Sequence, residues 1–316
     1  SDRVSWTNAN NDTAIFAGTA GTVSLGTGIT IGGLQFDTAS YIITNNILNW
    51  GAAGSIVANQ NATISSVMAG SAAITKSGAG AVTLAAKSTY TGGMTVDAGT
   101  LILAAGGNAG AIRGALTVNA GATVTSSVAN STGILVPVNP LNINGGTVDL
   151  SSGQHHVWGA TVNMVGGTLK FSSNIDNEQF NVVYNISNST SQAQILVLPG
   201  GAMRMRDSTN TPCITFNVEN GSQDIDLLVD APITAGTGVG GLTKTGAGTA
   251  KFTRSNTYVG GTIVNAGTLV LGAGGNNACV RGALTVNAGA TVTSTVDNTL
   301  GIVTAVSTLN INGGTV

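Results

Sequence analysis

Fourteen consecutive residues, RGALTVNAGATVTS, occur twice in this chain of 316 residues, at Arg113–Ser126 and again at Arg281–Ser294. The duplication extends further. Residues 76–148 align with residues 244–316 at a constant offset of 168 without a gap, and about 45 of the 73 aligned positions are identical. An active site is normally built once, whereas an architectural unit can be repeated. The duplication therefore indicates architecture before chemistry.

A shorter phrase recurs inside each copy: a small or polar residue and one or two glycines, flanked by alternating apolar residues, as in VNAGATVT and INGGTVDL. Most successive phrases lie 21–25 residues apart, and self-similarity at this period is typical of a solenoid. We expect the phrase glycines to be structural turn residues, because glycine tolerates the positive φ of a tight bend. These glycines are Gly99, Gly121, Gly146, Gly167, Gly201, Gly267, Gly289 and Gly314.

The phrase LTVNAGATVT shows how one coil is built. Leu116 and Val118 share a face because strand side chains alternate. The chain then bends at Gly121, and Val124 lies in a second strand that faces the same interior. A coil of two or three such strands buries its apolar side when the next coil stacks about 4.8 Å away and pairs with it in parallel ladders. The sequence therefore predicts an all-β parallel β-solenoid, or β-helix.

A β-sandwich is the alternative for short alternating strands, but it does not explain a gapless duplication that contains sub-repeats. Composition supports the all-β prediction. Charged residues make up 8% of the chain, against about 25% in a typical domain, which is too few to cover the outer faces of helices. We interpret residues 1–316 as a single continuous solenoid and a piece of a longer array. It comprises a first copy (76–148), divergent coils (149–243) and a second copy (244–316).

Composition also excludes several partners. The chain has no basic run for nucleic acid and no apolar stretch of about 20 residues that would form a transmembrane segment. Its only cysteines are Cys213 and Cys279. They lie about three coils apart, and at about 4.8 Å per coil this separation exceeds the distance of about 7 Å that a disulfide allows between Cα atoms. We therefore expect no bond between them.

Three acidic residues in GSQDIDLLVD form the best candidate for catalysis. Asp224 and Asp226 would share a face if they lie on a strand, and Asp230 follows closely. Glycosidases need two carboxyl groups about 5–9 Å apart. However, no Arg or Lys adjoins the stretch in sequence. A solvated acidic strand face is the alternative.

His155 and His156 are the only histidines. Neighbours in a strand point to opposite faces, so they are not expected to hold a metal jointly. One would be solvated and the other at a coil corner. GTGVGG (236–241) lacks the lysine of a phosphate-binding loop. We expect no metal and no cofactor.

Arg204 and Arg206 share a strand face, with Met203 and Met205 opposite. The arginines would attract acidic glycans or a neighbouring chain, or simply form a solvated outer face. Two further pairs belong to the repeat. We expect Lys76 and Lys244 at a coil edge, and Tyr90 and Tyr258 packed at a corner rather than binding a ligand.

Two segments resemble a known repeat. AAITKSGAGAVTLAAKSTYTGGMTVDAGTLILA (72–104) and GGLTKTGAGTAKFTRSNTYVGGTIVNAGTLVLG (240–272) resemble the autotransporter-associated β-strand repeat, also called the passenger-associated transport repeat. The opening VSWTNANNDTAIF (4–16) and ITIGGLQFD (29–37) resemble the region that commonly precedes it. The resemblance implies a right-handed parallel β-helix in a large, secreted, surface-displayed bacterial protein. It implies no catalytic residues.

These observations favour a non-catalytic structural or adhesive protein of the bacterial cell surface, a stiff β-helical stalk that is extracellular and associated with the outer membrane. The alternative is a subunit of a self-assembling extracellular filament or sheath. A β-helix polysaccharide lyase or hydrolase is a third hypothesis. The candidate partners are further copies, end to end or laterally, and host or cell-surface glycans.

Overall fold

The computed structural model describes residues 6–133, 138–158, 161–178, 181–206, 212–303 and 305–316. The secondary structure of these residues consists of β-strands and one short 3-10 helix, η1 (Asn8–Asn10). The strands pair in parallel and form a β-solenoid, which confirms the predicted fold class. The chain divides into two compact units, an N-terminal unit (Ser1–Asn139) and a C-terminal unit (Pro140–Val316).

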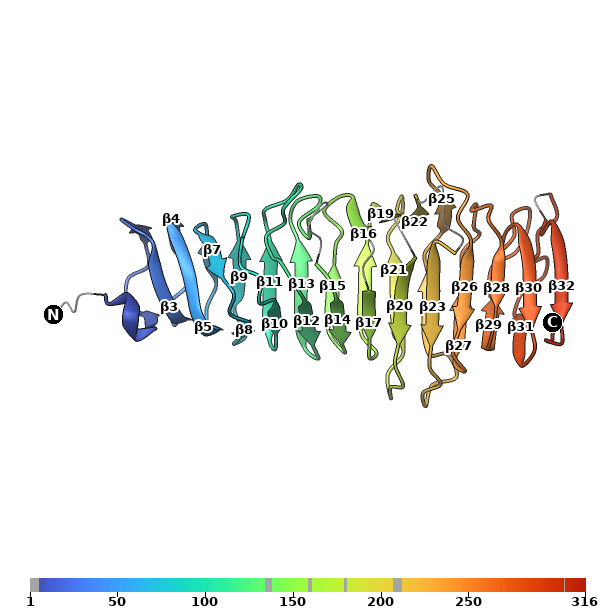
Figure 1. Ribbon diagram of the computed structural model, residues 1–316, viewed down its shortest axis with the longest axis horizontal. Coiled ribbons are helices and arrows are strands. Elements are labelled where there is room, and N and C mark those ends of the chain that lie inside the picture. Colours follow the sequence, from blue (N-terminus) through green and yellow to red (C-terminus); the bar gives the residue numbers. More distant parts are fainter. Residues whose placement is uncertain (1–5, 134–137, 159–160, 179–180, 207–211, 304) are drawn as a thin grey trace. The chain divides into compact units, whose positions relative to one another are not determined.

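The N-terminal unit has two parallel sheets, and strands that are neighbours in a sheet come from successive coils (Figure 1). The first sheet contains β1 (Thr13–Phe16), β3 (Ile29–Phe36), β5 (Ile47–Ala58), β7 (Val67–Gly70), β8 (Ile74–Ser77), β10 (Met94–Val96) and β12 (Leu116–Asn119). The second sheet contains β2 (Thr22–Leu25), β4 (Tyr41–Asn45), β6 (Ala62–Ile64), β9 (Ala81–Leu84), β11 (Gly99–Leu103) and β13 (Ala122–Ser126).

The C-terminal unit continues the pattern and adds a third sheet. Its first sheet contains β14 (Leu141–Asn144), β17 (Thr161–Met164), β20 (Val182–Ile186), β23 (Ile214–Val218), β26 (Leu242–Thr245), β28 (Thr262–Val264), β30 (Ala283–Asn287) and β32 (Thr308–Asn312). The second contains β15 (Thr147–Asp149), β18 (Thr168–Phe171), β21 (Ala193–Val197), β24 (Leu227–Asp230), β27 (Thr249–Phe252), β29 (Gly267–Leu271) and β31 (Ala290–Ser294). The third contains β16 (His155–Trp158), β19 (Asn174–Glu178), β22 (Ala202–Met205) and β25 (Ile233–Ala235). The third sheet falls within residues 149–243, so the divergent coils have a third side.

Register stacks apolar residues into interior columns. Val96 pairs with Val118, and Leu101 pairs with Val124, one coil further on. Leu116, Val118 and Val124 are fully buried, which confirms the interior face predicted from alternation. Burial of each such side chain contributes about 1.5–3 kcal/mol relative to its exposure, so the stacking of coils is what stabilises the fold.

The phrase glycines follow two different rules. Five have positive φ, as expected for turns: Gly99, Gly121, Gly167, Gly267 and Gly289. The expectation of positive φ is wrong at Gly146, Gly201 and Gly314, because in these Gly-Gly phrases the first glycine makes the turn: Gly145, Gly200 and Gly313. The second glycine can serve close packing instead. A Cβ atom on Gly201 would lie 2.5 Å from the carbonyl oxygen of Ser173.

Candidate functional site

The predicted carboxylate pair is not assembled. Strand β24 begins only at Leu227, so Asp224 and Asp226 lie in the bend before it rather than on a common strand face. Asp224 is exposed, whereas Asp226 is buried. The assumption that both lie on one strand is therefore wrong, and the two carboxyl groups differ in their exposure to solvent.

Asp226 has a structural task. One carboxylate oxygen accepts a hydrogen bond of 2.7 Å from the backbone N–H of Gly221, and the other accepts one of 2.8 Å from that of Thr249. A Cβ atom on Gly248 would lie 2.7 Å from the same carboxylate. Asp226 thus holds the bend before β24 against the next coil, and both its oxygens are already used.

Asp230 is paired with a base that the sequence did not place beside it. Arg254, 24 residues further on, donates to its carboxylate from Nε at 2.6 Å and Nη2 at 3.0 Å. Thr253 Oγ1 donates at 2.6 Å. The hydrogen bond from Arg254 is the main reason that the pKa of Asp230 lies below its ordinary value. A carboxylate kept ionised in this way is unsuited to act as a general acid.

The strongest charge cluster lies on the third sheet and includes Asp176, which sequence reasoning missed. Asp176 is fully buried, and its carboxylate accepts hydrogen bonds from Arg204, Arg206 and Gln154 at 2.5–2.8 Å. Burial alone would raise its pKa, but the hydrogen bonds and charges of the two arginines lower it below the ordinary value. The arginines therefore form ion pairs rather than a purely solvated face. The register between coils stacks Asp176 on Arg204, and no sequence pattern in these divergent coils revealed that register.

Met203 and Met205 are fully buried on the opposite face, as alternation predicts. The two histidines also divide between the faces. His155 is fully buried in the interior column, stacked on Ile175, and neither of its ring nitrogens has a hydrogen-bond partner in the structure described. Burial, and secondarily the charge of His156, lower the pKa of His155 to about 4.

His156 is mostly buried as well, with Nδ1 3.9 Å from the carboxylate of Asp176. The expectation of one solvated and one corner histidine is therefore wrong. Within the described ranges, no group of three or more His, Cys, Asp or Glu residues could hold a metal ion.

The repeat lysines are not at a coil edge as expected. Lys76 and Lys244 are fully buried, and each ammonium group donates to backbone carbonyl oxygens. A lysine in the interior was missed because charge is normally excluded from an apolar column. The sequence shows only that each lysine precedes a glycine-rich turn at the same spacing, which does not place its ammonium group inside the coil.

The repeat tyrosines are interior residues with different partners. Tyr90 and Tyr258 are both fully buried, and burial raises the pKa of both phenols. The hydroxyl of Tyr258 lies 2.5 Å from Oγ1 of Thr262. In the first copy Met94 occupies the position of Thr262, so the hydroxyl of Tyr90 lacks this side-chain partner and interacts only with the backbone of Arg113. Neither phenol is available to an external ligand.

Both cysteines are free thiols in buried positions. Cys279 Sγ donates to the carbonyl oxygen of Phe252 at 3.4 Å, and Cys213 Sγ donates to that of Asn177 at 3.6 Å. Burial raises the pKa of Cys279. Since the thiolate is the nucleophile, such a buried thiol is unreactive.

An asparagine ladder follows the outer face of the first sheet in the C-terminal unit. Asn163, Asn185 and Asn217 each donate from Nδ2 to Oδ1 of the asparagine one coil earlier, at 2.8–3.2 Å. Thr245 continues the ladder by donating to Asn217 at 3.1 Å. These side chains alternate with buried apolar residues in their strands, so the ladder links coils across the half-buried outer surface.

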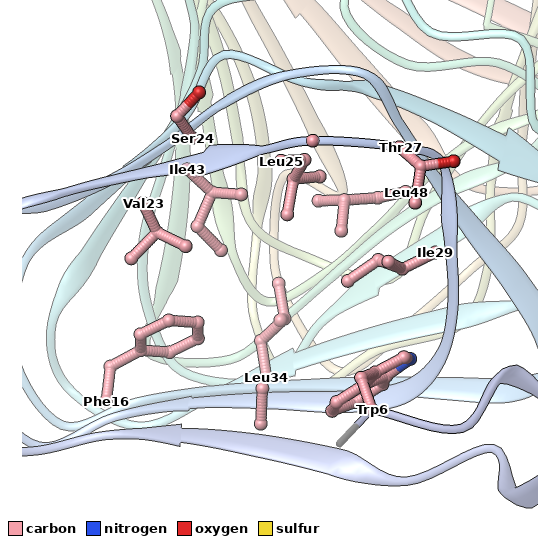
Figure 2. A pocket seen from close by; sticks show the side chains of 12 residues that line it. Trp6, Phe16, Val23, Ser24, Leu25, Thr27, Ile29, Leu34, Ile43 and Leu48 are labelled. Atoms are coloured by element: carbon pink, nitrogen blue, oxygen red, sulfur yellow. The ribbon is translucent and has the colours of Figure 1, made fainter. Parts of the chain in front are cut away.

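A cavity of about 340 Å³ lies among the first strands of the N-terminal unit. Figure 2 shows Phe16, Leu34 and Trp6 along one side of it and Val23, Ile43 and Leu25 along the other. Among the residues that the structure describes, no ionisable side chain lines the cavity. Its lining is mostly apolar, so it has room for an aliphatic or aromatic group.

The rim of this cavity is fixed by the N-terminal segment. Trp6 Nε1 donates to the carbonyl oxygen of Thr30 at 3.1 Å, and the N–H of Thr30 donates to Oδ1 of Asn8 at 2.9 Å. Two side chains thus supply the hydrogen bonds that a neighbouring strand would give to β3 at Thr30. The segment protects this part of the strand edge, as natural sheets do for their edges.

No helix within the described ranges has both the length and the apolar character needed to cross a membrane.

Comparisons with known proteins agree with this geometry. The passenger-associated-transport-repeat family model matches residues 74–103 and 242–271. The chain is similar to the adhesin BmaC autotransporter of Brucella suis biovar 1 (strain 1330), with 36% identity over 176 residues, covering 54% of this chain and 5% of that protein. The chain thus spans only a small part of the length of this relative. No solved structure matches the chain. The resemblance recognised in the sequence is confirmed, because residues 74–103 and 242–271 of this β-solenoid match the passenger-associated-transport-repeat model.

Proposed function

We propose that this chain is a non-catalytic stalk segment of a bacterial cell-surface adhesin of the autotransporter-passenger type, located outside the cell and associated with the outer membrane. The observation that carries the proposal is the 36% identity to an autotransporter adhesin over 54% of the chain. The fold supplies the mechanism. A β-solenoid grows by about 4.8 Å with each stacked coil, so repetition adds reach to a surface protein without a new fold.

The charged side chains support a structural rather than a catalytic role. Asp226 binds two backbone N–H groups. Asp230 binds Arg254, and Asp176 binds two arginines. The arginine partners hold the pKa of Asp176 and Asp230 below the ordinary value, and both oxygens of Asp226 accept hydrogen bonds, whereas glycoside hydrolysis needs one protonated carboxyl group opposite a second carboxylate.

Deletion of one repeat period tests the stalk. Removing residues 76–243 deletes one period of 168 residues, including the whole first copy, and joins residue 75 to the second copy in the phase that the first copy had. A small binding module would be fused to the first residue and displayed on non-adherent bacteria with the full or the shortened chain. We expect the full and the shortened chain to be displayed in equal amounts on the cell surface. On cells with a thick capsule, however, the shortened chain should capture fewer ligand-coated beads. Equal capture by both would contradict a role in reach.

The enzyme hypothesis has its own test. The purified chain would be incubated with neutral and acidic polysaccharides, and new reducing ends and unsaturated products would be measured. We expect neither. Cleavage that disappears in Asp224→Asn while the circular dichroism spectrum is retained would overturn the non-catalytic assignment.

Further copies of the chain, end to end or laterally, and host or cell-surface glycans are the partners that we propose. Sedimentation across a concentration series tests the first, because a filament subunit associates increasingly with concentration. A glycan array tests the second. Protease treatment of intact cells tests the location.

A further inference from the structure

The two repeat lysines occupy places that an apolar side chain would normally fill. Lys76 stacks between Ile56 and Val96 in the first sheet of the N-terminal unit. In the C-terminal unit, Lys244 stacks between Phe216 and Val264. Burial of a charged group is unfavourable by several kcal/mol unless it is fully hydrogen-bonded. Each lysine must therefore have a compensating site.

That site is built from backbone carbonyl groups of two coils. Lys76 Nζ donates to the carbonyl oxygens of Gly78 at 2.8 Å and Ala98 at 2.6 Å, with Ser77 further away at 3.4 Å. An ammonium group has three N–H donors, so three oxygens satisfy it. Gly78 belongs to the turn of the lysine's own coil, whereas Ala98 belongs to the turn of the coil that follows.

The second copy repeats this geometry. Lys244 Nζ donates to the carbonyl oxygens of Gly246 at 2.7 Å, Ala266 at 2.9 Å and Thr245 at 3.0 Å. In both copies the carbonyl group of the following coil lies 22 residues after the lysine. The arrangement is thus a property of the repeat rather than of one location.

Two glycines of the repeat, Gly99 and Gly267, lie directly against the lysine sites. Gly99 and Gly267 have φ of 66° and 63°. A Cβ atom on Gly99 would lie 2.5 Å from the carbonyl oxygen of Gly78 and 2.7 Å from Nζ of Lys76. Any side chain there would displace the ammonium group or the turn. The spacing of lysine and glycine in the repeat therefore follows from the space that the ammonium group needs.

We infer that the ammonium group of each repeat lysine is a clamp between two successive coils, which binds the turn of its own coil and the turn of the next. Closure of a repeat then depends on the coil that follows it in the chain, because the site lacks an acceptor until Ala98 or Ala266 is in place. The inference is independent of the adhesive role.

The ionisation of the lysines is consistent with such a site. Burial lowers the pKa of Lys76 to about 8. Burial also lowers that of Lys244 to about 8, although the carboxylate of Asp226 acts in the opposite direction. Both groups are therefore cations at neutral pH. As pH rises past about 8 they lose a proton and one of the three donors.

Hydrogen exchange on the full chain tests the clamp. Lys76→Met keeps most of the apolar stem and removes the ammonium group, and Lys87→Met is the control because Lys87 is exposed. We expect at least tenfold faster amide exchange in β8 and also in β11 of the following coil, with no change in the control. The same change is expected around β26 and β29 in Lys244→Met.

Two results would overturn the inference. If the amide groups of Lys76→Met exchange as slowly as those of the control variant, the ammonium group does not stabilise the coils and only the apolar stem of the lysine does. If exchange rises in β8 but not in β11, the lysine does not couple coils. Should the variants fail to fold, nuclear magnetic resonance of wild-type protein labelled with ¹⁵N-lysine decides. We expect two ammonium signals protected from exchange with water that disappear near pH 8, and protection of neither would refute the clamp.

Discussion

Arg204 binds the carboxylate of Asp176 through Nε at 2.5 Å and Nη2 at 2.6 Å, although the two residues lie 28 positions apart in the chain. Arg206 adds a third bond at 2.8 Å. The Asp176 side chain is fully buried, whereas those of the arginines are 28% and 32% exposed. One buried carboxylate therefore holds two partly solvated guanidinium groups on the third sheet.

Removal of the charge of Asp176 should destabilise the C-terminal unit. Asp176→Asn removes the carboxylate charge that binds both Arg204 and Arg206, and breaking a buried ion pair is unfavourable by about 3–5 kcal/mol. We expect a loss of about 2–3 kcal/mol, because water screens the partly exposed arginines. Urea denaturation followed by circular dichroism measures it. Asp224→Asn, at an exposed site, is the control, and an equal effect of both variants would contradict the assignment.

His155 should make the fold sensitive to acid. Its pKa is lowered from about 6.5 to about 4 in the folded chain, so the unfolded chain takes up a proton first as pH falls. The corresponding stability is present above pH 6.5 and is lost between 6.5 and 4. It amounts to about 3 kcal/mol at 1.36 kcal/mol per pKa unit.

We expect His155→Leu, which extends the apolar column of Ile175, to lose less stability than wild type between pH 7 and pH 4. Denaturation at both values measures the difference. His156→Gln should leave this part of the acid sensitivity in place. A His155→Leu profile parallel to that of the wild type would show that another group titrates.

The two repeat tyrosines form a matched pair. Tyr258→Phe removes the hydrogen bond with Thr262 and leaves a buried hydroxyl group alone, which is unfavourable by about 1–3 kcal/mol. Tyr90→Phe removes a hydroxyl group that lacks a side-chain partner and interacts only with the backbone of Arg113, so the loss of stability should be smaller than in Tyr258→Phe. Thermal denaturation of the two variants gives the comparison. Equal losses would mean that Tyr90 has a partner as good as Thr262.

The asparagine ladder should contribute measurably to stability. Asn185 donates to Asn163 and accepts from Asn217, so Asn185→Ala breaks two hydrogen bonds, worth about 0.5–1.5 kcal/mol each. Asn185→Thr should fall between Ala and wild type, because Thr245 already shows that a threonine hydroxyl can occupy a place in the ladder. Denaturation midpoints rank the three proteins. If Asn185→Ala has the same denaturation midpoint as the wild type, the ladder does not contribute to stability.

The repeat period and the alternation within it were sufficient to predict the coils and their interior columns. Leu116 and Val118 could be placed inside because side chains in a strand alternate with a period of two, whatever the tertiary context. The positive φ of Gly121 follows from another local rule, since glycine tolerates the left-handed conformation that a tight bend needs. Parallel stacking follows as well, since a single coil cannot bury its apolar side alone.

The charged sites were decided by tertiary structure. Asp176 meets Arg204, and Asp230 meets Arg254, only through the register between coils, and in the divergent stretch that register depends on the lengths of irregular turns. Lys76 lies inside the core because three carbonyl oxygens converge there from two coils, which no local pattern reveals. Periodicity is a property of neighbouring residues, whereas the pairing of charges depends on where distant turns come to lie.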